Sequence, residues 1–206
     1  MVRTPKRPVP LAAGLFLLVA AGLRPQPPAA PPALAGPLAP LAAQVQWVRA
    51  HSALAHGQGA RAFVLMRSAV ALEPSSPSAW ILMANQLGLQ LASPESGRPA
   101  DERAAWLRAA LATLEEGQAE VERPEALALH GAILLMSHAE TDPDLPWPDA
   151  TRGLFADAAD QARRALALAH GAEGHTHDEN WEASVRGLLE TAEAGARGEL
   201  GPLTDD

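Results

Sequence analysis

Four side chains that could hold a metal ion lie close together in the C-terminal quarter of the chain. The segment AHGAEGHTHDEN places His170, His175, His177 and Asp178 within nine residues. Two imidazoles separated by one residue on an extended backbone can bind one metal ion, and a carboxylate can add an oxygen ligand. A preorganised metal site needs rigid supporting elements, whereas this segment is rich in glycine. We therefore favour a solvated loop and predict no cofactor, with metal binding as the weaker alternative.

Other residues that could do chemistry are too far apart or lack their partners. His130 and His138 are eight residues apart, which on a helix separates them by about 12 Å along the axis, too far for one metal ion. We expect His130 to pack where two helices cross. The chain has no cysteine, and it contains no P-loop, Gly-x-Ser-x-Gly or His-Glu-x-x-His motif. We predict no catalytic residues and therefore a protein that is not an enzyme.

The N-terminus resembles an export signal. Three basic residues precede an uncharged apolar run from Val9 to Leu23, which as a helix spans roughly 22 Å, less than the hydrocarbon core of about 30 Å. This length favours a signal peptide. The nearest small-residue cleavage pattern, at Ala33 to Ala35, lies well beyond the run, so an uncleaved membrane anchor remains the alternative. Either interpretation sends the rest of the chain across the membrane.

Charge and composition exclude one class of partner and favour one class of fold. Residues 1–44 contain four basic and no acidic residues, so the remainder carries 12 basic against 24 acidic side chains. A domain this acidic repels a phosphate backbone, so we predict no nucleic-acid binding. The chain is 48% apolar but only 4% aromatic, and much of the apolar content is alanine. Alanine favours helices that pack closely against one another.

Apolar residues recur at helical spacing in three places. In PSAWILMANQLG, Trp80, Met83, Ala84 and Leu87 share one face of a helix because they stand three, one and three residues apart. The same spacing recurs at Trp47, Ala50, His51 and Leu54, and at Leu127, His130, Gly131 and Leu134. We predict that each stretch is the first helix of a repeated helix pair. Small residues mark the second helix of the pair, at Ala62, Met66, Ala69 and Leu72 and again at Ala158, Ala162, Ala165 and Leu168.

This alternation resembles the tetratricopeptide (TPR) repeat. In that family a bulky residue opens the first helix, small residues lie where the helices cross, and a proline follows the second helix. The matching positions here are Trp80, Ala84 and Leu87, then Ala62 and Ala69, and finally Pro74. The period departs from the family, because Trp80 and Leu127 are 47 residues apart rather than 34. The resemblance implies an all-α, right-handed TPR-like solenoid of about three helix pairs plus a C-terminal capping helix.

The predicted organisation has six segments. Prolines that open helices are expected at Pro77, Pro99, Pro124 and Pro148, where the missing N–H costs nothing. The segments are a signal peptide or membrane anchor at 1–24, a proline- and alanine-rich linker at 25–41, a repeat domain at 42–170, a flexible loop at 171–177, a capping helix at 178–196 and a disordered tail at 197–206.

By the same resemblance we expect a scaffold that binds a protein partner, either a peptide or a helix, on a concave surface. The membrane is a further partner through the N-terminal segment. Trp147 lies in a proline-flanked loop, DPDLPWPDA, and tryptophan is a favoured interface anchor, although it could instead cover its own helices. The predicted partner-binding residues are Trp47, Ala50, Leu54, Trp80, Met83 and Trp147. The alternative function is a structural subunit of a larger membrane assembly.

The location follows from the same features. The chain has one lysine against fifteen arginines, a bias that favours a bacterial origin together with the signal-like N-terminus. We therefore expect a single-pass protein of the bacterial inner membrane with a periplasmic domain, or a periplasmic protein after cleavage.

Overall fold

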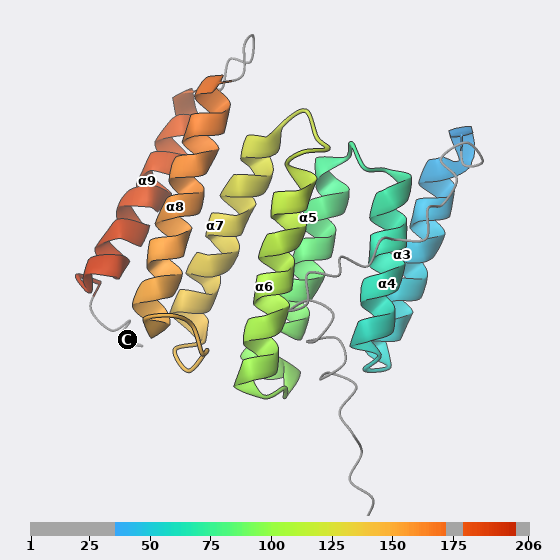
Figure 1. The fold of residues 1–206 in the computed structure, drawn as a ribbon, viewed down its shortest axis with the longest axis horizontal. Helices are drawn as coiled ribbons and strands as arrows, with labels where there is room; N and C mark the ends of the chain where they lie inside the picture. Colours follow the sequence, from blue (N-terminus) through green and yellow to red (C-terminus); the bar gives the residue numbers. More distant parts are fainter. Residues whose placement is uncertain (1–35, 172–178, 201–206) are drawn as a thin grey trace, which may run out of the picture. The chain divides into compact units, whose positions relative to one another are not determined.

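The fold was obtained as a computed structural model, which describes residues 36–171 and 179–200. These residues form seven α-helices and no β-strand (Figure 1). The predicted all-α class is therefore confirmed. The helices are α3 (Ala39–Ala55), α4 (Gly59–Leu72), α5 (Pro77–Asn85), α6 (Ala100–Gly117), α7 (Pro124–Thr141), α8 (Ala150–Gly171) and α9 (Glu179–Arg197).

The chain divides into two compact units, Met1–Ala71 and Leu72–Asp206. The described part of the first unit consists of a short 3-10 turn, η1 (Gly36–Leu38), followed by α3 and nearly all of α4. The second unit contains the remaining helices. The boundary falls inside residues 42–170, which the sequence pattern treats as one domain.

In the first unit a tight turn joins α3 to α4. Gly57 adopts a positive φ of 70°, a conformation that costs glycine little, and the Gln58 N–H donates to the carbonyl oxygen of Ala53 at 2.8 Å. Both helices bury small side chains on one face, with one larger residue on each, Trp47 and Met66. The alanine-rich pattern therefore predicted these helices correctly.

In the second unit α5 continues into a π-helical turn, η2 (Gln86–Leu91), and a 3-10 turn, η3 (Pro94–Ser96), leads on to α6. Gly88 of η2 lies close to α7, because a Cβ atom placed there would lie 3.2 Å from Leu134. His138 donates from Nε2 to the Gly88 carbonyl oxygen at 2.8 Å. A small residue in the π-helical turn thus lets α5 and α7 pack tightly.

Consecutive helices of the second unit pack against each other, and α5 also contacts α7. Trp80 is the fourth residue of α5, and Leu127 is the fourth residue of α7. Both lie against Gly117 at the end of α6, where a Cβ atom would come within 2.6 Å of Trp80 and 2.9 Å of Leu127. The two contacts that pair Asn85 with His130 and Gly88 with His138 show that α5 and α7 run in the same direction.

Small side chains let α7, α8 and α9 pack closely. Ala128 and Ala132 of α7, Ala162 and Ala165 of α8, and Val185 of α9 form one buried cluster. Partly buried leucines and Trp181 surround it. The helix predicted at 178–196 is therefore present as α9 and lies over α8, whereas most of the predicted 171–177 loop and of the 197–206 tail falls outside the described residues.

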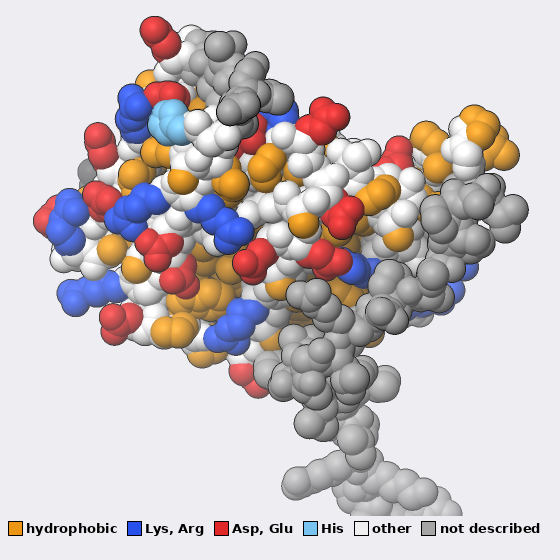
Figure 2. All heavy atoms as spheres, turned by 45° about the horizontal axis from the view of Figure 1, so that its top comes forward, with side chains coloured by type: hydrophobic (Ala, Val, Ile, Leu, Met, Phe, Trp, Pro, Cys, Tyr) orange, Lys and Arg blue, Asp and Glu red, His pale blue; other side chains and the backbone are white. Residues whose placement is uncertain are grey.

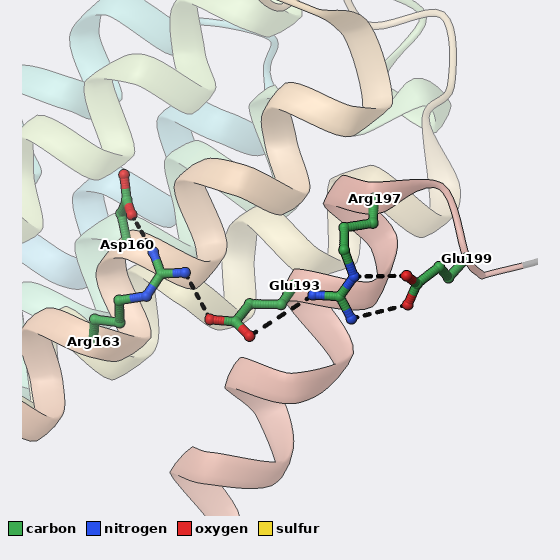
Figure 3. Close-up of polar contacts among 5 residues, drawn as sticks. All are labelled: Asp160, Arg163, Glu193, Arg197 and Glu199. Carbon is green, nitrogen blue, oxygen red and sulfur yellow. Dashed lines mark hydrogen bonds and ion pairs between the residues drawn. The ribbon is translucent and has the colours of Figure 1, made fainter.

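Alternating charges join α8 to α9 at the protein surface (Figure 3). Arg163 of α8 contacts Asp160 at 2.5 Å and Glu193 of α9 at 2.7 Å. Glu193 lies 3.9 Å from Arg197, which pairs with Glu199 at 2.7 Å. Hydrogen bonding from Arg197 lowers the pKa of Glu199. Figure 2 shows acidic and basic side chains interspersed over this end of the second unit.

Candidate functional site

The residues of the first unit that the sequence analysis assigned to partner binding lie mainly on its buried face. Trp47 and Ala50 of α3 are both buried, and Leu54 is half-buried. The opposite face of α3 is the exposed one. The bulky and small residues that mark the repeat pattern are therefore packing residues in this unit.

Two of the three predicted residues in the second unit, Trp80 and Met83, are also core residues. Trp80 is 3% exposed and Met83 has no exposed surface. Trp80 donates from its indole Nε1 to the carbonyl oxygen of Pro74 at 2.8 Å, which satisfies its polar atom within the protein. Neither side chain is therefore exposed enough to contact a partner.

Trp147 folds back onto the helices beside its loop. The guanidinium of Arg108, from α6, lies 4.9 Å from the centre of the Trp147 ring, within the range of a cation–π interaction. The indole Nε1 donates to the Asp157 carboxylate of α8 at 2.8 Å. Trp147 therefore lies with α6 and α8, remains half-exposed, and is separate from the contacts between α5 and α7.

The base of this loop is held by a buried ion pair. Arg103 of α6 donates through Nε and Nη2 to both carboxylate oxygens of Asp142, at 3.0 and 2.9 Å. The two side chains are 12% and 3% exposed. Leu145 is also buried. A bidentate, buried pair of this kind fixes the direction in which the chain leaves α7.

The loop differs from the sequence prediction at its second end. Pro148 was expected inside the first turn of a helix, but α8 begins at Ala150. Asp149 and Ala150 have φ values of 62° and 52°, left-handed conformations that L-residues adopt at a cost. The helix cannot extend back through these residues, so Pro148 lies outside it.

The histidine cluster falls mostly outside the described residues. His175, His177 and Asp178 are not described. His170 is an exposed residue in the last turn of α8, and its Nε2 lies 3.1 Å from the carboxylate of Glu182 on α9. Within residues 36–171 and 179–200, no three histidine or acidic side chains come together in a way that could hold a metal ion.

A different set of residues forms an accessible surface on α5 and α7. His130 of α7 and Asn85 of α5 are joined by a hydrogen bond of 2.7 Å between Nε2 and Oδ1. Leu89 follows Asn85 by one turn and is 46% exposed, and Ile133 follows His130 by one turn and is 44% exposed. We call Asn85 at the end of α5, Leu89 in the adjoining η2, and His130 and Ile133 of α7 the α5–α7 face.

The chemistry of this face suits binding. Burial lowers the pKa of His130 below its usual 6.5, so its imidazole is neutral at pH 7. Because Asn85 Oδ1 can only accept, His130 carries its proton on Nε2, and its Nδ1 is left as an acceptor. The face therefore combines two exposed aliphatic side chains with a hydrogen-bonded polar pair.

Sequence reasoning assigned none of these four residues to partner binding, although it expected His130 where two helices meet. His130 was expected at a helix crossing, and its contact with Asn85 across α5 and α7 confirms this. Leu89 and Ile133 were missed because the apolar pattern was read only along Trp80, Met83 and Leu87. Leu89 and Ile133 are apolar residues outside that pattern, and this was the signal in the sequence that could have identified them.

Comparisons with protein families, with curated proteins and with solved structures found no significant match. In the described part of the chain, no helix combines the length and the apolar content needed to cross a membrane. The run from Val9 to Leu23 lies outside that part.

Proposed function

We propose that this protein is a non-catalytic scaffold with a TPR-like right-handed helical repeat, exported to the periplasm or anchored in the bacterial inner membrane, that binds a protein partner on the α5–α7 face. The occupant is an extended peptide or a single helix. The second unit supplies the binding surface, and the rigid packing of its helices holds that surface in place.

The packing around Gly117 supports a repeat. Helices α5 and α7 both begin with a proline, Pro77 and Pro124, and both carry a bulky apolar residue at the fourth position. These residues, Trp80 and Leu127, meet at the same glycine of the intervening helix. When helix pairs stack, the residues at the same position in successive repeats come close to each other. Trp80 and Leu127 behave in this way.

The α5–α7 face is the observation that carries the binding proposal. Leu89 is 46% exposed in the π-helical turn after α5, and Ile133 is 44% exposed on α7. The Asn85–His130 hydrogen bond joins these two parts of the chain one turn earlier. Apolar anchors on a rigid surface supply affinity. Residues 73–206 carry nine basic and 24 acidic side chains, so the surroundings of the face select a basic partner.

The test compares photo-crosslinking from three positions of the full-length protein in its native cell. A photo-reactive amino acid at Leu89 or Ile133 should crosslink the same partner protein. The same amino acid at Leu200, which is also 44% exposed but lies beyond α9, is the matched control. Equal crosslinking from all three positions, or none from the α5–α7 face, would contradict the proposal.

Substitution provides a second measurement. Ile133→Glu places a carboxylate in the apolar contact and should abolish the crosslink formed from position 89, whereas Leu200→Glu should leave it unchanged. Both side chains are exposed to a similar degree, so we expect both variants to keep the fold. Circular dichroism of the two variants checks this.

A further inference from the structure

The exposed face of α3 carries a continuous row of large apolar side chains. Leu38, Leu41, Val45 and Val48 are between 50% and 68% exposed. They are spaced by three, four and three residues, so they line one side of the helix. We call these four residues the α3 stripe. Figure 2 shows a group of hydrophobic side chains at the start of α3.

The stripe leads into a basic hollow at the turn between α3 and α4. Arg49 and Ser52 lie one helical turn beyond Val45 and Val48. The hollow is lined by Arg49, Ser52, Ala53, His56, Gln58 and Arg61. Arg49 and Arg61 donate only to the side-chain oxygens of Gln46 and Gln58 among the described residues. Their charges are therefore available to an anion.

The charges of the two units have opposite signs. Residues 1–72 contain seven of the sixteen basic residues and none of the 24 acidic ones. Residues 73–206 are therefore acidic, with a net formal charge of −15. A surface that combines exposed apolar side chains with arginine, and has no carboxylate, is attracted to anionic surfaces.

We propose that the α3 stripe and the adjoining arginine hollow bind the surface of a bilayer that contains anionic phospholipids. The four apolar side chains enter the boundary between headgroups and acyl chains, and Arg49 and Arg61 contact lipid phosphates. An amphipathic helix that lies in the plane of a membrane likewise combines apolar side chains that enter the bilayer with basic side chains that contact headgroups.

The size of the surface favours lipid over a folded protein. A stable protein interface uses about 20–30 residues on each side, whereas the α3 stripe offers one row of four side chains. A bilayer does not need a surface of complementary shape, so a narrow row of apolar side chains is enough to bind it. The same argument disfavours a second copy of this chain as the occupant.

The position of α3 in the sequence agrees with this occupant. The apolar run from Val9 to Leu23 ends fifteen residues before α3 begins, and no charged residue occurs between Arg24 and Arg49. Even fully extended, fifteen residues span at most about 54 Å. If that run is inserted, α3 stays within reach of the same bilayer. The proposal also holds for a cleaved chain, because the stripe lies after Ala35.

The test uses the absence of cysteine from the natural chain. Val48→Cys in the full-length protein is labelled with an environment-sensitive fluorophore. The protein is reconstituted in phosphatidylcholine vesicles with or without phosphatidylglycerol. We expect a blue shift at position 48, with quenching by acyl-chain quenchers, that is stronger in vesicles with phosphatidylglycerol. Ile133→Cys is the matched control and should show neither change.

A second pair of variants tests the basic hollow. Arg49→Gln combined with Arg61→Gln should remove the dependence on phosphatidylglycerol, and Arg163→Gln, at an exposed arginine of α8, should not. A label at position 48 that stays in water in the anionic vesicles would overturn the proposal. A shift that appears without vesicles at high protein concentration would also overturn it, by assigning the stripe to a second copy. Crosslinking from Leu89 and Ile133 is measured separately, so failure of either proposal is recognised on its own.

Discussion

His138 of α7 donates a hydrogen bond from Nε2 to the main-chain oxygen of Gly88, at 2.8 Å. This bond ties α7 to the π-helical turn that follows α5. The other ring nitrogen, Nδ1, is buried and has no hydrogen-bond partner among the described residues. A proton added there would place a charge in a buried site. Burial lowers the pKa of His138, and Arg103 acts in the same direction, whereas the Gly88 bond and Asp142 oppose it.

We expect the free energy of unfolding to fall as the solution is acidified below about pH 6.5. The pKa values of His130 and His138 are both lowered from 6.5 by burial. Below that pH the unfolded chain therefore binds more protons than the folded chain, so stability rises with pH. The loss on acidification levels off once the pH is below the folded pKa values. Urea unfolding at about pH 8 and about pH 5 measures the effect.

The contribution of His138 can be separated with His138→Gln. The glutamine amide keeps a donor for Gly88 but does not titrate, so the stability of this variant should depend less on pH than that of the natural protein. His56→Gln, at an exposed histidine, is the control and should keep the natural pH dependence. An unchanged pH dependence in His138→Gln would contradict the assignment.

Gly117→Ala should destabilise the second unit. The added Cβ would lie 2.6 Å from Trp80 and 2.9 Å from Leu127, so two buried side chains would have to move, at a cost of about 1–3 kcal/mol. Gly187→Ala in α9 meets nothing within 4 Å and should stabilise by about 0.4–1 kcal/mol. Thermal and urea unfolding compare the two. If Gly117→Ala is as stable as Gly187→Ala, Trp80 and Leu127 do not pack against Gly117 as closely as described.

Asp142→Ala should cost about 3–5 kcal/mol, because it leaves Arg103, which is only 12% exposed, without a counter-charge. The double variant Arg103→Met with Asp142→Leu removes both charges and should recover much of the loss. Arg163→Ala breaks a surface ion pair (Figure 3) and should change stability little. Urea unfolding of the four proteins is the measurement, and a double variant less stable than Asp142→Ala would contradict the account.

Arg108 and Trp147 should be energetically coupled. Their cation–π contact at 4.9 Å is worth about 0.5–1 kcal/mol at an exposed site. A double-mutant cycle with Arg108→Met and Trp147→Leu measures the coupling free energy. A cycle of Arg108→Met with Leu200→Ala should show none, because the two sites share no contact. Zero coupling between Arg108 and Trp147 would mean that the loop does not hold this position in solution.

Local sequence information was enough to predict most helices. Proline at the start and apolar residues at helical spacing identified α5 from Pro77 and α7 from Pro124, because both signals depend on residues only a few positions apart. The start of α8 was predicted too early. There the left-handed conformations of Asp149 and Ala150 accompany the contacts of Trp147 with Arg108 and Asp157, which join residues from separate helices.

Composition and local spacing are enough to show that this chain is helical, acidic after its first 72 residues and rich in small packing side chains. Which apolar faces are covered follows from the way the helices pack. Trp80 and Met83 are buried while Leu89 and Ile133 remain exposed, although all four lie on apolar helices. Periodicity tells which residues share a face, but burial depends on the helices that pack against that face, and these come from distant parts of the chain.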